Sequence, residues 1–181
     1  MIIVGTSSIA IFMIWTLLIR FVDVQIVGPQ ESTVGFATLN SCFHSFTETN
    51  IFLYILTDWL GLVPIAIAFG FSILGFVQLI KRKSLLNVDH SILALGIFYI
   101  VVMAVYAFFE MVVINYRPIL INDYLEPSYP SSTTMLVMCI MPTTAIQLNK
   151  RIKNKLLKKC VVTAIIIFII FMIVSRVVDD G

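Results

Sequence analysis

The chain has 181 residues, of which 60% are hydrophobic and only 12% charged, with a formal net charge of +2. Ordinary soluble domains carry about 25% charged residues, so this chain lacks the polar side chains that a soluble surface needs. The composition, with a mean hydropathy of +1.03, excludes a soluble globular domain, a disordered chain and a collagen-like repeat. It predicts an integral membrane protein, and at about 20 residues per span the length allows five or six helices.

Five apolar runs predict membrane-spanning helices, so we expect an all-α, polytopic helix bundle that forms one membrane domain over residues 1–181. No basic residue precedes the first run and no small-residue cleavage site follows it, so it is predicted to be a retained span rather than a signal peptide. The expected spans are about residues 2–19, 60–80, 91–109, 131–146 and 160–174.

Two of the connections have patterns of their own. In the connection at residues 20–50, Gly28-Pro29 interrupts the chain, and apolar residues then recur at helical spacing at Phe36, Leu39, Phe43 and Phe46. This spacing predicts a short amphipathic helix, which either lies on the membrane surface or packs on the bundle. The connection at residues 115–131 is rich in proline, asparagine and aspartate, and it predicts a loop.

The basic residues predict the orientation of the chain in the membrane. With five spans, the second–third and fourth–fifth connections fall on one side, which then holds nine of the twelve basic residues and a single acid, Asp89. These nine are Lys81, Arg82, Lys83, Lys150, Arg151, Lys153, Lys155, Lys158 and Lys159. The positive-inside rule places this side in the cytoplasm, with the N-terminus, and places the C-terminus outside. The predicted location is the cell membrane.

Two arginines on the predicted outer side suggest a site for an anion. Arg117 and Arg176 both lie at the ends of spans, where a charge is costly unless it is paired or used. The segment from Pro130 to Thr134 opens the fourth span, and a serine-capped helix start presents backbone N–H groups and the positive end of the helix dipole. An arginine can add a bidentate contact to a phosphate. The alternatives are an ordinary helix cap, snorkelling to the headgroups, or an ion pair with Glu110, Asp123, Glu126 or Asp179.

The same residues resemble the motifs of a known family. Arg117-Pro118 matches the end of the motif KxxxxxxRP, Pro130-Ser131 the start of PSGH, and Ser175-Arg176 the start of SRxxxxxHxxxD. In order and spacing the chain is similar to the type-2 phosphatidic acid phosphatases, which share a fold with the vanadium haloperoxidases. It looks like a bacterial membrane member of that family, with five of the family's six spans.

The resemblance implies a phosphate site on the outer face, formed by Arg117, Ser131, Ser132 and Arg176. It also implies hydrolysis of a lipid phosphate or a polyprenyl pyrophosphate through a phosphohistidine, with no metal and no cofactor. The expected partners are membrane lipid phosphates and the bilayer, with no nucleic acid.

The chain departs from the family at the positions that carry the chemistry. Glu110 stands where the first motif has lysine, and Ser132 and Thr133 stand where the second has glycine and the acid histidine. A threonine hydroxyl has no accessible pKa for donating a proton. The nucleophilic histidine would follow Gly181 directly, and the only histidines, His44 and His90, form no ligand or catalytic motif. The catalytic residues are therefore not identified, and impaired activity is expected.

Two other functions stay open at this point. One is a non-catalytic membrane protein that binds lipid phosphates or a partner protein. The other is a small transporter or channel subunit, which is less favoured because the centres of the spans lack charged residues that an ion path would use. The three cysteines, Cys42, Cys139 and Cys160, are widely spaced and predict neither a metal site nor a disulfide framework.

Overall fold

The computed structural model describes residues 2–27, 32–47, 51–84, 87–121 and 124–180, with only the backbone given at 2, 27, 32, 43–47, 51, 117–121, 124–128, 179 and 180. Most of these residues are helical, as the composition predicted. They form two compact units. Unit 1 comprises Met1–Thr49, Val112–Ser131 and Val178–Gly181, and unit 2 comprises Asn50–Met111 and Ser132–Val177.

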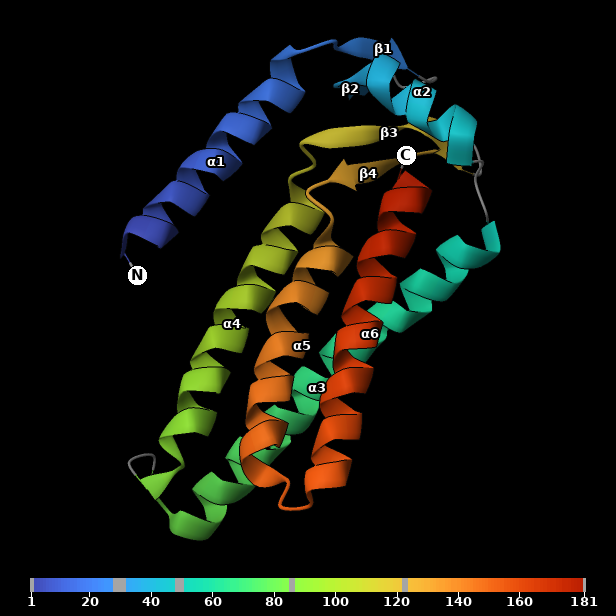
Figure 1. Ribbon diagram of the computed structural model, residues 1–181. Coiled ribbons are helices and arrows are strands. Elements are labelled where there is room, and N and C mark those ends of the chain that lie inside the picture. Colours follow the sequence, from blue (N-terminus) through green and yellow to red (C-terminus); the bar gives the residue numbers. More distant parts are fainter. Residues whose placement is uncertain (1, 28–31, 48–50, 85–86, 122–123, 181) are drawn as a thin grey trace. The chain divides into compact units, whose positions relative to one another are not determined.

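Unit 2 is built, within the described residues, from the four helices α3 (Ile51–Arg82), α4 (His90–Met111), α5 (Ser132–Arg151) and α6 (Lys155–Asp180), the last of which ends in unit 1. Short connections join α3 to α4 and α5 to α6, and both connections lie at the same end of the unit (Figure 1). The nine basic residues of the two predicted cytoplasmic connections belong to this end, which we call the basic end.

The core of unit 2 forms around α5. Leu136 and Ile140 pack with buried side chains of α3 and α4, whereas Val137 and Met141, each one residue further along the helix, pack with α6. Figure 1 shows α5 between α4 and α6, with α3 behind them. Because neighbours cover α5 on several sides, it needs fewer apolar residues than a helix that faces lipid.

Polar side chains of α5 are satisfied inside the bundle. Thr144 Oγ1 donates to the carbonyl of Ile140 at 2.7 Å, and Gln147 Nε2 donates to the carbonyl of Ser91 on α4 at 3.3 Å. The hydroxyls of Thr143 and Tyr99 lie 3.0 Å apart and link α5 to α4. These contacts explain how a helix with several polar residues occupies the centre of an otherwise apolar bundle.

Among the described residues, four helices are long and apolar enough to cross a membrane, at Ile3–Phe21, Phe52–Arg82, His90–Met111 and Lys155–Val178. These helices indicate a membrane protein, and they coincide with four of the five predicted spans. The expected span at residues 131–146 corresponds to α5, which is not among the four, so the count of five spans stays a prediction.

Unit 1 contains α1 (Ile2–Phe21), β1 (Gln25–Val27), β2 (Ser32–Val34), α2 (Ala37–Thr47), β3 (Asn115–Ile121) and β4 (Tyr124–Tyr129). One face of α1 contacts the rest of the unit. Phe12 stacks on Tyr129 and Trp15 stacks on Phe36, with ring centroids 6.2 and 5.9 Å apart. Ile19 is the one buried residue among the side chains described for this helix, and the others are exposed or nearly so, as suits an apolar helix that faces lipid.

A close backbone contact joins the two hairpins of unit 1. The amide of Gly35 donates to Asn115 Oδ1 at 2.8 Å in a buried position, which links the end of β2 to the start of β3. A Cβ at Gly35 would lie 1.8 Å from the carbonyl oxygen of Ile19, so this site requires glycine for steric reasons.

In the connection at residues 115–131, residues 115–121 and 124–129 form two paired strands, so the predicted loop was wrong. β3 pairs antiparallel with β4, and the register shifts between Asn115 and Tyr116 and again between Tyr116 and Leu120. Pro118 and Pro127 lie within the strands, and proline normally argues against a strand because it has no N–H to donate. The irregular pairing accommodates them. The predicted short helix after Gly28-Pro29 is confirmed as α2, and residues 28–31 lie outside the described residues.

Candidate functional site

The end of unit 2 opposite the basic end contains a buried arginine with polar neighbours. Arg176, near the end of α6, donates from Nη2 to Asp58 Oδ1 on α3 and to Thr133 Oγ1 in the first turn of α5, the latter at 3.4 Å. Its guanidinium carbon lies 5.9 Å from the centroid of the Tyr54 ring. We call Tyr54, Asp58, Thr133 and Arg176 the Arg176 cluster. It brings three helices together around the guanidinium group of Arg176.

Local sequence explains how α3 contributes to this cluster. Tyr54, Asp58 and Gly61 recur at helical spacing of i, i+4 and i+7, so they share one face of α3. Gly61 allows close approach to α5, because a Cβ at this position would lie 2.8 Å from Thr133 Cγ2. Thr133 therefore packs against the backbone of α3 while its hydroxyl faces Arg176.

The burial of the two charges is unequal. The side chain of Arg176 is only 8% exposed, whereas that of Asp58 is 47% exposed. The arginine therefore bears most of the desolvation cost, and the carboxylate keeps much of its contact with the surroundings. In addition, Arg176 Nε is buried and has no hydrogen-bond partner among the described residues. A buried donor left unpaired costs free energy, so this N–H is available to an acceptor that enters the cluster.

The structure brings together two of the residues that the sequence had singled out. Arg176 and Thr133 are 43 residues apart in the sequence and in contact in the fold. Ser132 is the first residue of α5 and is half-buried, and Ser131 is the half-buried residue before it, assigned to unit 1. Arg117 belongs to β3 in unit 1, and its side chain lies outside the described residues. Its predicted role in phosphate binding stays a prediction.

Asp58 is the residue of the cluster that the sequence did not indicate. An ion pair with Glu110, Asp123, Glu126 or Asp179 was one of the alternatives for the two arginines, whereas Arg176 pairs with Asp58. Asp58 was not among these candidates because the second span was predicted to begin at about residue 60, which placed Asp58 ahead of it. α3 in fact begins at Ile51, so Asp58 lies on a regular helical face. The spacing of Tyr54, Asp58 and Gly61 was the signal that could have found it.

His90 does not form part of the Arg176 cluster. His90 is the first residue of α4, at the basic end, and Glu110, one residue before the end of this helix, lies about 30 Å away along it. His44 belongs to α2, and its side chain lies outside the described residues. Within the part of the chain that the structure describes, no three His, Cys, Asp or Glu side chains lie close enough together to hold a metal ion.

Comparisons of this chain with family models, with curated proteins and with solved structures find no match. The resemblance to the type-2 phosphatidic acid phosphatases therefore rests on the motif residues alone.

Proposed function

We propose that this chain is a multi-pass membrane protein that binds the phosphate group of a membrane lipid at the Arg176 cluster. The observation that carries the proposal is the buried guanidinium of Arg176 beside the first turn of α5, whose Nε has no partner in the part of the chain that the structure describes. A helix N-terminus favours an anion through its free N–H groups and its dipole. Arginine is the residue best suited to hold a phosphate through two N–H groups.

In this proposal Asp58 occupies the position of the anion when no phosphate is bound. The carboxylate is half exposed, so it can turn away from the cluster at a smaller cost than a buried group. Phosphate would then take over the contact with Nη2 and add one with Nε. The resemblance adds Ser132, the first residue of α5 in the same unit, as a further contact, and this contact is part of the proposal.

The proposal concerns binding rather than turnover. Thr133 stands at the position where the family has its acid histidine, and in this fold its hydroxyl accepts a hydrogen bond from Arg176. A threonine hydroxyl does not exchange a proton readily near neutral pH. The cluster supplies a positive charge and hydrogen-bond donors, which are what the binding of a phosphate requires. Phosphate release from lipid phosphates is measured alongside binding, as the direct test of the family's activity.

Binding can be tested with vanadate and with phosphatidic acid in lipid nanodiscs. Arg176→Gln should weaken binding by about 10- to 100-fold, because a hydrogen bond to a charged group contributes roughly 1.5–3 kcal/mol. Arg176→Lys keeps the charge but loses the paired N–H groups, so it should bind with intermediate affinity. Asp58→Asn should bind more tightly than the parent, since the competing carboxylate is removed.

Asp89→Asn provides a matched control, because Asp89 is a carboxylate in an ion pair at the basic end of the same unit. This variant should bind vanadate as the parent does. Equal binding by the parent and Arg176→Gln, with both folded by circular dichroism, would refute the proposal. An increase for Asp58→Asn that is matched by Asp89→Asn would show a nonspecific effect of charge.

We further propose that α5 is a fifth span and that the basic end faces the cytoplasm. Its 20 residues extend about 30 Å, the thickness of the hydrocarbon core, and its neighbours in the bundle cover its polar residues. A cysteine at position 128 should react with an impermeant reagent from outside the cell, and one at position 154 should not. The test uses a background in which Cys42, Cys139 and Cys160 are replaced by serine. The reverse labelling pattern would contradict this topology.

A further inference from the structure

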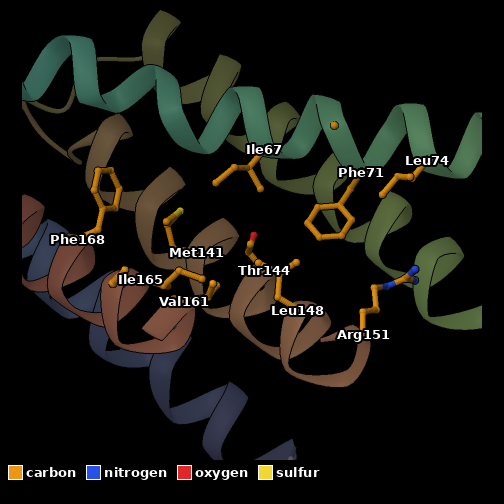
Figure 2. Close-up of a pocket in the computed structure, with 12 residues that line it drawn as sticks. Ile67, Phe71, Leu74, Met141, Thr144, Leu148, Arg151, Val161, Ile165 and Phe168 are labelled. Atoms are coloured by element: carbon orange, nitrogen blue, oxygen red, sulfur yellow. The ribbon is translucent and has the colours of Figure 1, made fainter. Parts of the chain in front are cut away.

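An apolar groove of about 560 Å³ lies between α3, α5 and α6, away from the Arg176 cluster. Figure 2 shows its lining, with Phe168 at one end and Arg151 at the other. Between them the wall consists of apolar side chains such as Phe71, Leu148 and Ile165. The hydroxyl of Thr144 also lines the groove, but it donates to a carbonyl of its own helix. The groove therefore offers a long apolar surface with a single charged end.

Gly70 gives the groove part of its width. This glycine lines the groove from α3, and a Cβ added there would meet no atom within 4 Å. A side chain at this position would therefore start in open space beside the groove. An unfilled gap in an apolar surface loses dispersion contacts on one side, so an apolar chain that fills it is favoured.

The charge at the mouth of the groove is not fully neutralised. Arg151 Nη2 lies 3.8 Å from Asp89 Oδ2, and the same carboxylate is bonded more closely, at 3.2 Å, by Arg82 Nη1. One carboxylate thus serves two guanidinium groups, and the three side chains together keep a net charge of +1. Arg151 is partly exposed, so a second anion can reach it.

The first turn of α6 carries lysines in a position that does not favour the helix itself. Asn154 caps α6, because its Oδ1 accepts from the amides of Leu156 and Leu157 at 2.9 and 3.3 Å. Lys155, Lys158 and Lys159 follow, although the N-terminus of a helix is the end that disfavours cations. Lys158 precedes Val161, which lines the groove, by three residues and so shares its face of α6. These charges are complementary to an anionic headgroup beside the groove.

We propose that this groove binds an acyl chain of an anionic phospholipid, whose headgroup phosphate contacts Arg151 and Lys158. The acyl chain lies along the apolar wall toward Phe168, and the phosphate lies at the basic end of unit 2. A soluble phosphate lacks the acyl chain that the groove would hold, and in a zwitterionic lipid the choline cation offsets the attraction of the phosphate to the basic mouth, so both features together favour an anionic lipid. This site is distinct from the Arg176 cluster and does not depend on the function proposed for it.

The test measures lipid retained by the full chain in detergent, by native mass spectrometry, together with the shift in its unfolding temperature. The probes are dioleoyl phosphatidylglycerol, dioleoyl phosphatidylcholine with the same chains, and glycerol 3-phosphate without chains. The parent should prefer phosphatidylglycerol to phosphatidylcholine, and Arg151→Gln should reduce that preference about fivefold, as expected for one basic residue near an anionic lipid. Lys150→Gln is the control, because it removes one positive charge from the same last turn of α5, whereas Lys150 does not line the groove.

The apolar part of the proposal has its own pair of variants. Gly70→Leu should fill the groove and abolish the retention of both lipids. Gly96→Leu is the matched control, since Gly96 is a helical glycine with equally open space that lines a different groove. Ala164→Leu fills the same groove from α6 and serves if Gly70→Leu does not fold.

Three results would overturn the proposal. The first is undiminished retention of phosphatidylglycerol by folded Gly70→Leu or Ala164→Leu. The second is equal retention of the two lipids by the parent. The third is stabilisation by glycerol 3-phosphate that equals the stabilisation by phosphatidylglycerol.

Discussion

A methyl group added at Gly61 should push α3 away from α5 unless Thr133 loses its own methyl group. A Cβ at Gly61 would lie 2.8 Å from Thr133 Cγ2, whereas Oγ1 and Cβ of the same threonine lie at ordinary contact distances of 3.8 and 3.9 Å. Thr133 is held in this rotamer by packing and by the hydrogen bond that its hydroxyl accepts from Arg176. The overlap therefore involves one methyl group that cannot turn away freely.

The expected magnitudes follow from this contact. Overpacking lowers the free energy of unfolding by about 1–3 kcal/mol, and replacing glycine by alanine inside a helix raises it by up to about 1 kcal/mol. Gly61→Ala should thus lower the free energy of unfolding by about 0–2 kcal/mol. Thr133→Ser removes Cγ2 and keeps the hydroxyl, so the double variant should escape the overlap. The two substitutions should then show a favourable coupling energy of about 1–3 kcal/mol.

The coupling is measured by reversible unfolding of the four proteins in mixed detergent micelles, as a double-mutant cycle. Gly96→Ala is the control for helix propensity, because a Cβ at Gly96 meets no atom within 4 Å. It should not be destabilising. If the effects of Gly61→Ala and Thr133→Ser are additive within about 0.5 kcal/mol, the contact between α3 and α5 at the Arg176 cluster does not exist as described.

Two further predictions concern the ion pairs of Asp89 and the hydrogen bond from Gly35 to Asn115 in unit 1. The pKa of Asp89 is held below its usual value of 3.8, first by the hydrogen bond from Gln78 and then by two arginines. A carboxyl group with a lowered pKa stabilises the fold above its unfolded-state value and loses that contribution as the pH falls through the folded-state pKa. The advantage of the parent over Asp89→Asn in unfolding temperature should therefore shrink below pH 3.8, and a constant difference down to pH 2 would contradict this assignment. Asn115→Ala leaves the buried amide of Gly35 without its acceptor and should cost about 1–3 kcal/mol, seen as faster hydrogen exchange at Gly35. Asn40→Ala, which removes a less buried bond to the carbonyl of Gly35, should have the smaller effect, and equal exchange in the two variants would count against the Asn115 contact.

Several features of this protein could be read directly from local sequence. Apolar runs of sufficient length predicted helices at four of the positions where the structure has helices able to cross a membrane. Apolar recurrence after Gly28-Pro29 predicted the helix α2. These features depend on the length and hydrophobicity of one segment at a time, so no knowledge of its neighbours is needed.

Local sequence failed where partners from distant segments decide the structure. The hairpin of β3 and β4 was missed because Pro118 and Pro127 argue against strands, and only the irregular pairing of the two strands accommodates them. The fourth apolar run predicted a short helix over residues 131–146, whereas α5 continues to Arg151, and its polar Thr144 and Gln147 form hydrogen bonds inside the bundle.

For the candidate site too, the sequence determined some features and the tertiary structure determined others. The sequence alone determined that this is a membrane protein. It also indicated that the charge of Arg176 must be paired or used, because an unpaired charge at the end of an apolar helix is costly in any fold. Only the tertiary structure decided that the partner is Asp58 and that Thr133 lies beside them. The pairing depends on where α3 begins and on how closely Gly61 lets it approach α5. Such contacts are set by the geometry of helix packing, which no single segment of the sequence specifies.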